Sequence, residues 1–183
     1  QKVLQEWCAK QVRDRTKMAL DQSLRIQNPE ELLDVLVARR AIESEAAALA
    51  AQRATPEEVE SLRSIIEEQQ GRLDAGSSAT KQNNEFHLAI ARIARNRVLE
   101  AALDLIYGHP DWMRVLEYVR ARVGSEMVEE HRRIIQEIAR KRPTGARNAM
   151  VKHMNSVIED VGIYLRDWGD MEEKPDVGER EDS

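Results

Sequence analysis

Apolar residues recur every three or four positions along most of the chain, and this spacing is the period of an amphipathic α-helix. No stretch shows the strict alternation of apolar and polar residues that a half-buried strand requires. Proline, glycine or serine marks several of the breaks between the periodic stretches, because proline lacks the amide that a helix interior needs and glycine is a poor helix former. The pattern predicts helices over about residues 1–24, 29–53, 56–74, 80–94, 98–106, 111–123, 125–141 and 146–168. We therefore expect an all-α fold, an antiparallel bundle of about seven helices. The first of the eight predicted helices could pack either on this bundle or on a partner chain.

Two of these helices have clear start signals, at Asn28-Pro29 and at Thr55-Pro56. In each case a polar capping residue precedes a proline at the first helical position, and acidic residues follow in the first turn. We also expect Thr80 to cap the next helix, and Gly76 to end the one before it.

Two histidines lie on either side of the last break in the periodicity, which we expect to be a turn beginning at Arg142. His131 precedes Arg142 by eleven residues and His153 follows it by eleven. Two antiparallel helices that rise about 1.5 Å per residue would carry both imidazoles to one level, roughly 16 Å from the turn. A third histidine, His87, follows Asn83 by four residues, so these two side chains share one face of an earlier helix. The spacing allows three imidazoles and an amide oxygen to converge inside the bundle.

The composition favours a soluble, cytoplasmic protein. The 183 residues suffice for one domain with a real core. No apolar run approaches the ~20 residues of a membrane-spanning helix, and no charged-then-apolar leader opens the sequence. The single Cys8 cannot form an internal disulfide, which fits a reducing compartment.

Acidic residues are concentrated at the C-terminus. Residues 169–183 hold seven acidic and two basic residues and almost no apolar ones, so we expect them to be disordered. The rest of the chain carries 26 acidic and 26 basic residues. A body without net positive charge does not attract phosphate backbones, so charge argues against direct binding of nucleic acid. We expect three parts: an N-terminal helix and linker (1–27), a ligand-binding domain (28–168) and an acidic tail (169–183).

Five segments and their spacing together resemble a known family. They are residues 31–35, 38–47, 83–91 with Asn96 after them, 130–135 and 149–154. The combination is similar to the FCD domain, the all-helical effector-binding half of FadR-subfamily GntR transcription regulators. His131 follows His87 by 44 residues and His153 follows His131 by 22, which are the separations of the histidines that bind a divalent ion in metal-binding members. Those members usually carry an aspartate four residues before the first histidine, where this chain has Asn83.

The resemblance implies a metal and effector cavity at the centre of the bundle. Its metal ligands would be Asn83, His87, His131 and His153. Three imidazoles and an oxygen suit zinc or nickel. An amide oxygen is a weaker donor than a carboxylate, so Asn83 would leave the metal more positive and favour an anionic effector, a small organic acid. Each histidine alone is better explained as a hydrogen-bonded core or surface residue, and only the joint spacing favours a metal site.

The same resemblance points Arg39 into the effector cavity, where a guanidinium can hold a carboxylate through two parallel hydrogen bonds. Its neighbour Arg40 is the obvious alternative, and without the family both would be interpreted as solvated charges on a helix. Asn84 is a weaker candidate than Asn83 for the place of the aspartate. Asn96 is expected to be a helix-end residue and His109 a loop residue, both outside the ligand set.

These features favour a sensor that is not an enzyme. We expect a domain that binds a divalent metal and a small organic acid, forms a homodimer, and acts on DNA only through a winged helix-turn-helix that nothing in this chain resembles. One alternative is a metal-dependent hydrolase or lyase, although no general-base motif such as His-Glu-x-x-His is present. Another is a structural dimerisation module with a vestigial site.

Overall fold

The structure is a computed structural model that describes residues 29–109 and 125–172. Its helices are α2 (Pro29–Arg53), α3 (Pro56–Asp74), α4 (Thr80–Ile93), α5 (Arg97–Tyr107), α7 (Ser125–Ala139) and α8 (Pro143–Glu172). These residues contain no strand, which confirms the all-α prediction. About seven helices are predicted and six lie in the described ranges, while the segments expected over 1–24 and 111–123 fall outside them. None of the described helices is long and apolar enough to cross a membrane.

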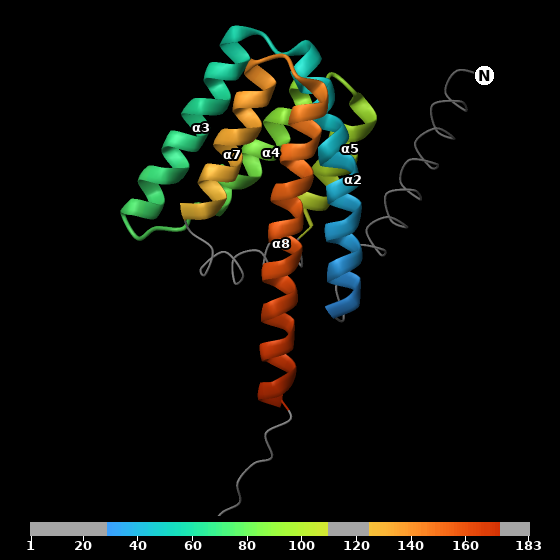
Figure 1. Ribbon diagram of the computed structural model, residues 1–183. Helices are drawn as coiled ribbons and strands as arrows, with labels where there is room; N and C mark the ends of the chain where they lie inside the picture. The colour runs from blue at the N-terminus through green and yellow to red at the C-terminus, as the bar shows by residue number, and fades with distance from the viewer. Residues whose placement is uncertain (1–28, 110–124, 173–183) are drawn as a thin grey trace, which may run out of the picture.

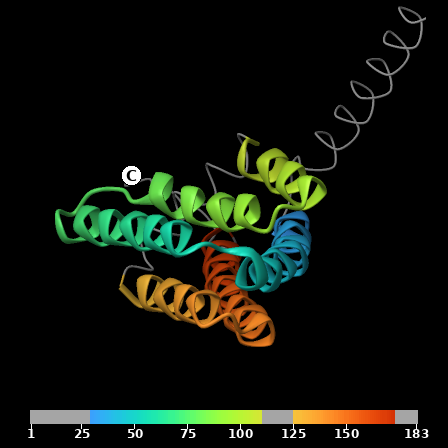
Figure 2. The ribbon, with the colours of Figure 1, turned by 90° about the horizontal axis from the view of Figure 1, so that it is seen from above.

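The helices form a bundle in which α2 and α8 lie side by side and make the most extensive contact of the described elements (Figure 1). Helix α7 packs against α8 and α3, and α3 also runs alongside α4 (Figure 2). Helix α2 contacts α4, α5, α7 and α8, so it borders each helix that carries one of the three histidines. The C-terminal half of α8 extends beyond α3, α4 and α7 (Figure 1).

The core between these helices is apolar and closely packed. The alanines of α2 at positions 46–48, 50 and 51 are buried on more than one side of the helix, and such small side chains let neighbouring helices approach closely. The largest fully buried apolar side chains come from all six helices: Leu36, Leu62, Ile66, Phe86, Ile90, Leu103, Ile134, Ile138 and Met150. Burying one such side chain contributes about 1.5–3 kcal/mol. Burial of these side chains is therefore a major source of the bundle's stability.

The starts of α3 and α5 follow the predicted signals, whereas the start of α4 does not. Thr55 forms a complete capping box, because its Oγ1 accepts from the Glu58 amide and Glu58 Oε2 accepts from the Thr55 amide. Asn96 caps α5, and its Oδ1 accepts from the amides of residues 98 and 99. The prediction for Thr80 is wrong. Ala79 occupies the cap position and Thr80 is the first helical residue, so the side chain of Thr80 cannot act as the N-cap.

The turn between α7 and α8 lies slightly earlier than its sequence signals suggest. Helix α7 ends at Ala139, and Lys141 adopts a left-handed conformation with φ 57°. The amide of Lys141 bonds to the Ile138 carbonyl and the amide of Arg142 to the Glu137 carbonyl, which is a Schellman ending. Pro143 then opens α8, where its missing amide proton leaves no hydrogen bond unmade.

Candidate metal and effector site

Three buried imidazoles meet where α4, α7 and α8 face one another. The side chains of His87, His131 and His153 are 1%, 0% and 1% exposed. Candidate ligand atoms from all three lie within 4.8 Å of one another. Nε2 of His131 is 3.3 Å from Nε2 of His153. These two residues therefore face each other across the hairpin, as their spacing predicts.

Each histidine occupies a core-facing position of its helix. On α7, His131 shares the inner stripe with Val128 and Ile134, both fully buried. On α8, His153 follows Met150 by three residues, and Met150 is also fully buried. Apolar neighbours at helical spacing turn these faces inward. The hydrophobic pattern of the helices thus carries the imidazoles into the centre.

An oxygen atom faces the Nδ1 atom of each imidazole. The pairs are Glu43 Oε2 with His87 (2.5 Å), Gln69 Oε1 with His131 (3.0 Å) and Glu130 Oε2 with His153 (2.9 Å). Carboxylate and amide oxygens accept hydrogen bonds, so these partners favour a proton on Nδ1 of each ring. The Nε2 atom of each ring is then left with a lone pair. We refer to Glu43, Gln69 and Glu130 as the outer partners.

A neutral imidazole that is protonated on Nδ1 keeps a lone pair on Nε2 that a cation can accept. Among the residues that the structure describes, neither ring nitrogen of His87 makes a hydrogen bond, although Nδ1 lies 2.5 Å from Glu43 Oε2. The Nε2 atoms of His131 and His153 face each other across 3.3 Å. Burial lowers the pKa of His87 to about 4, so this ring is neutral at neutral pH. An unpaired buried polar atom costs about 1–3 kcal/mol, so the unpaired Nε2 atom of His87 favours an electrophile such as a cation.

The centre of the bundle is filled by contacting rings, so the expected central cavity is a misprediction. The ring centroid of Phe86 lies 4.3 Å from that of His131, and the ring of Tyr107 stacks on His87 at 5.8 Å. Two hollows that are lined by described residues lie instead at the surface. One, of about 460 Å³, is lined by residues of α3 and α7. The other, of about 530 Å³, is lined by residues of α3, α4 and α5. Tyr107 and Asn84 line the second hollow, which therefore adjoins the histidine site.

Arg39 lies next to the site and is held by two buried side chains. Its Nε donates to Glu43 Oε1 at 2.7 Å, its Nη2 donates to the Tyr107 hydroxyl, and its guanidinium carbon lies 4.6 Å from the centre of the Tyr107 ring. The Tyr107 hydroxyl in turn donates to Glu43 Oε1 at 3.1 Å. Burial alone would raise the pKa of Glu43, but Arg39 and His87 hold it well below its usual range. A charged network thus links Arg39 to His87 through one carboxylate.

The remaining predicted residues have distinct places. Asn83 is buried one helical turn before His87 on the inner side of α4. Arg40 points elsewhere, since its Nη1 donates to Asn155 Oδ1 at 2.8 Å. His109 is buried after the end of α5 and is not part of the three-histidine group.

Comparison with known proteins decides the family. Residues 34–156, more than half of the chain, match the FCD domain. This chain belongs to the FCD domain family. The match confirms the resemblance to the effector-binding domain of GntR-family regulators.

Several relatives of this FCD domain are transcription regulators. A protein of Escherichia coli K12 named as regulator of the L-lactate dehydrogenase operon is 32% identical over 139 residues, covering 74% of this chain and 53% of that protein. The Exu regulon transcriptional regulator of the same organism is 28% identical over 148 residues, covering 78% of this chain and 55% of the relative. The chain thus spans about half the length of these curated relatives.

Solved structures have the same fold as this FCD domain. A GntR protein of Streptococcus agalactiae superimposes with a TM-score of 0.62 at 25% identity, covering 73% of this chain and 61% of that one. McbR/YncC of E. coli gives a TM-score of 0.66 at 20% identity, covering 74% of this chain and 66% of that one, and supports the fold alone.

The donor set of this FCD domain fits a first-row divalent cation. Zinc–imidazole bonds of about 2.0–2.1 Å place two nitrogens on one tetrahedral or octahedral ion roughly 2.8–3.4 Å apart. The 3.3 Å between His131 Nε2 and His153 Nε2 falls in this range. Metal-bound histidines also characteristically present their other ring nitrogen to an oxygen, as all three do here.

The sequence did not predict the outer partners as site residues of this FCD domain. For two of them, a polar residue at a core-facing position of the helix could have indicated the role. Gln69 continues the apolar stripe of Leu62 and Ile66 on α3, so it is a polar residue at a core position and is 2% exposed. Glu43 lies one turn after Arg39 on the inner face of α2. Glu130 has no comparable signal, since it is half-buried and adjoins exposed Glu129.

Proposed function

We propose that this FCD domain is the sensing part of a transcription regulator and binds a divalent metal through His87, His131 and His153. The observation that carries the proposal is that candidate ligand atoms of three buried imidazoles lie within 4.8 Å of one another, with Nε2 of His131 3.3 Å from Nε2 of His153. Asn83, one turn from His87, is the proposed fourth ligand. Zinc and nickel suit this largely nitrogenous set.

The proposed effector is a small organic acid. A bound metal would supply a Lewis-acidic position for a carboxylate, and Asn83 adds no negative charge that would oppose it. The negative charge of Glu43 is offset by the positive charge of Arg39. Glu43 would therefore neutralise little of the charge of a bound metal, which would stay available to an anionic ligand. Arg39 is proposed to bind the acid as well, sharing its guanidinium between Glu43 and the ligand. The hollow lined by Tyr107 and Asn84 is the proposed approach.

The relatives indicate which acid to try first. The E. coli relative is named for the L-lactate dehydrogenase operon, so L-lactate is the first candidate probe. Another relative, LutR of Bacillus subtilis, is described as an HTH-type regulator and is 26% identical over 148 residues. We propose that, in the whole protein, a DNA-binding segment reads the occupancy of this domain, in the cytoplasm. The coupling requires only that the acid binds one arrangement of the helices better than another.

Metal analysis and ligand titration test this function. The purified protein should contain close to one zinc or nickel ion per chain by elemental analysis, and the chelated protein should regain one ion in a calorimetric titration. L-Lactate and other small hydroxy acids and dicarboxylates should raise the melting temperature of the metal-loaded protein more than that of the metal-free protein. Absence of metal binding together with no thermal shift would support the structural module, and turnover in a substrate panel would support an enzyme.

We also propose a homodimer, because regulators of this family bind two-fold operators and the N-terminal segment has an apolar stripe suited to a partner. That segment lies outside the described residues. Light scattering should give twice the 21.0 kDa mass of the chain, and a monomer mass at high protein concentration would contradict the proposal.

A further inference from the structure

The three outer partners differ in their access to solvent. Glu43 is 1% exposed and Gln69 is 2% exposed, so the sides of the site behind His87 and His131 are closed by protein. The side chain of Glu130 is 16% exposed, although His153, which it contacts, is only 1% exposed. Among the three partners, Glu130 alone joins a candidate ligand to the surface.

Glu130 is held in place from α8. Ser156 Oγ donates to Glu130 Oε1 at 2.7 Å, while Oε2 of the same carboxylate lies 2.9 Å from His153 Nδ1. His153 and Ser156 are neighbours on one face of α8, three residues apart. The carboxylate therefore bridges α7 and α8 and fixes the rotation of the His153 ring.

The surface around Glu130 is acidic. Glu126 lies one turn before Glu130 on α7, and Asp160 lies one turn after Ser156 on α8. Burial raises the pKa of Asp160, and the carboxylates of Glu130, Glu126 and Glu159 raise it further, so these charges act on one another. Lys152 opposes them at Glu130. The carboxylates that act on Asp160 outnumber this lysine, and negative charge attracts a metal cation.

We infer that Glu130 is the positioning residue for His153 and that a metal ion reaches and leaves the three histidines along this face between α7 and α8. The inference rests on the proposed metal-binding function. His153 is the ligand suited to swing, because its outer partner can move into solvent, whereas Glu43 and Gln69 are enclosed by the core. Loss of the Glu130 contact would free the ring to rotate and would remove the acceptor that keeps the proton on Nδ1.

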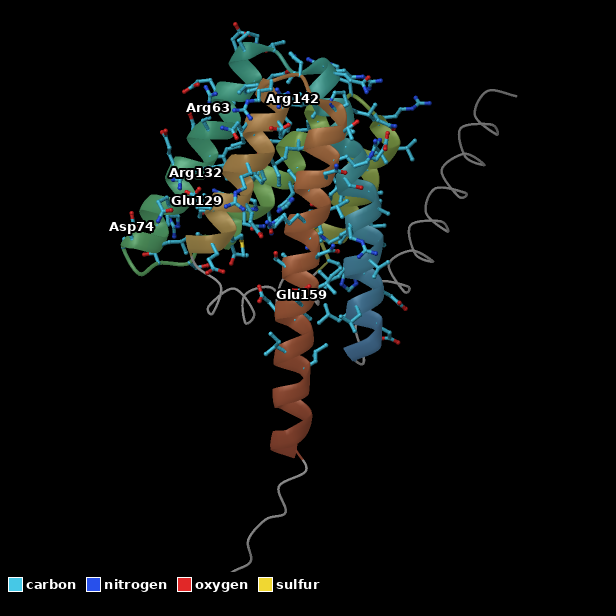
Figure 3. All side chains as sticks on the ribbon, viewed as in Figure 1. Arg63, Asp74, Glu129, Arg132, Arg142 and Glu159 are labelled. Atoms are coloured by element: carbon cyan, nitrogen blue, oxygen red, sulfur yellow. The ribbon has the colours of Figure 1, made fainter. Side chains whose placement is uncertain are left out.

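Equilibrium affinity tests the positioning role. Zinc affinity is measured by competition with a chromogenic chelator for the wild type, Glu130→Ala, Glu130→Gln and Glu129→Gln. Glu130→Ala should weaken binding by about 10–100-fold. Glu130→Gln should recover most of this loss, because its amide oxygen can still accept from Nδ1. Glu129→Gln is the matched control, since Glu129 is exposed on α7 beside Arg132 and pairs with it (Figure 3).

Loading kinetics tests the route. Stopped-flow mixing of zinc with the metal-free protein should show slower loading in Glu126→Gln/Asp160→Asn, by about threefold or more at low ionic strength, and salt should reduce the difference. The release rate into excess chelator should change little, because neither residue holds a ligand. Glu60→Gln/Glu67→Gln removes two exposed charges from α3 and should load like the wild type.

The outcomes separate this inference from the function on which it rests. If the wild type binds no zinc, the proposed function fails first. If it binds zinc but Glu130→Ala binds equally tightly, or Glu130→Gln fails to recover the loss, the positioning role is wrong. If both double variants load at the same rate, the route is wrong. Circular dichroism and the nitrogen shifts of the His153 ring in the metal-free variants distinguish altered ring orientation from lost folding.

Discussion

Arg39 and Glu43 form a buried ion pair one turn apart on α2, with Nε 2.7 Å from Oε1 and both side chains 1% exposed. The other oxygen of Glu43 lies 2.5 Å from Nδ1 of His87. One carboxylate therefore serves the residue proposed to bind the effector and a residue proposed to bind the metal. A change in the charge around Arg39 should therefore alter the interaction between Glu43 and the His87 ring.

Removing Glu43 should destabilise the domain far more than removing the whole pair. Glu43→Ala leaves the guanidinium of Arg39 buried without its counter-charge, which costs about 3–5 kcal/mol in the free energy of unfolding. The double variant Arg39→Leu/Glu43→Leu removes both charges and should lose much less. Urea unfolding of the metal-free proteins measures both values. Equal losses in the single and double variants would contradict a charge-pairing role.

The capping box at the start of α3 should contribute measurably to stability. Thr55→Ala removes the oxygen that accepts from the Glu58 amide and should lower the free energy of unfolding by about 1 kcal/mol. Thr55→Ser keeps that oxygen and serves as the control. A loss of the same size in both variants would assign the effect to the methyl group instead of the cap.

Much of the fold could be predicted because its signals are local. The capping residue Thr55 and the break at Gly76 bound α3 without reference to any other helix. The prediction that Thr80 caps α4 is wrong because it rests on the hydroxyl group alone. The backbone conformation places the cap at Ala79, so Thr80 is the first helical residue. The turn after α7 was placed too late because Pro143 opens the next helix, a role that proline also fills well.

The candidate site could be predicted only in its inner part. The spacing of His87, His131 and His153 is a property of the sequence, but Gln69 meets His131 because α3 packs on α7. Such a contact joins residues 62 positions apart and has no local signal. The ring contacts that fill the centre likewise depend on how α4, α5 and α7 pack, so an open cavity was the wrong expectation.

Gly145 in the first turn of α8 should be coupled to Glu137 on α7. A Cβ atom at residue 145 would overlap with Glu137 Oε2, so that carboxylate would have to move, which would disturb its pair with Arg140. Replacing a helical glycine with alanine otherwise stabilises by about 0.5–1 kcal/mol. Gly145→Ala should therefore be nearly neutral in the wild type and stabilising in a Glu137→Ala background. Urea unfolding of the four proteins measures the coupling, and equal effects in both backgrounds would exclude it.

His131→Ala should remove most of the bound metal while leaving the helix content nearly unchanged. The imidazole is fully buried at the convergence of the three rings, whereas the core that stabilises the helices is apolar. His109→Ala is the matched control, because His109 is also buried but lies outside the three-histidine group. Elemental analysis gives the metal content and circular dichroism the helicity. Collapse of the helical signal in His131→Ala would mean that the histidine is chiefly structural.

Asn83→Asp should change the affinities for metal and effector in opposite directions. The substitution would place a negative charge beside the proposed cation, and an anionic oxygen binds a divalent ion better than an amide oxygen does, so metal affinity should rise about tenfold or more. A carboxylate effector would then meet a less positive centre and bind more weakly. Asn148→Asp is the control, since it adds the same charge at an exposed position of α8. Calorimetric titration with zinc, and then with L-lactate on the zinc-loaded protein, measures both affinities. Unchanged zinc affinity in Asn83→Asp would place Asn83 outside the ligand set, and a parallel rise in both affinities would show that the net charge of the site does not govern the effector.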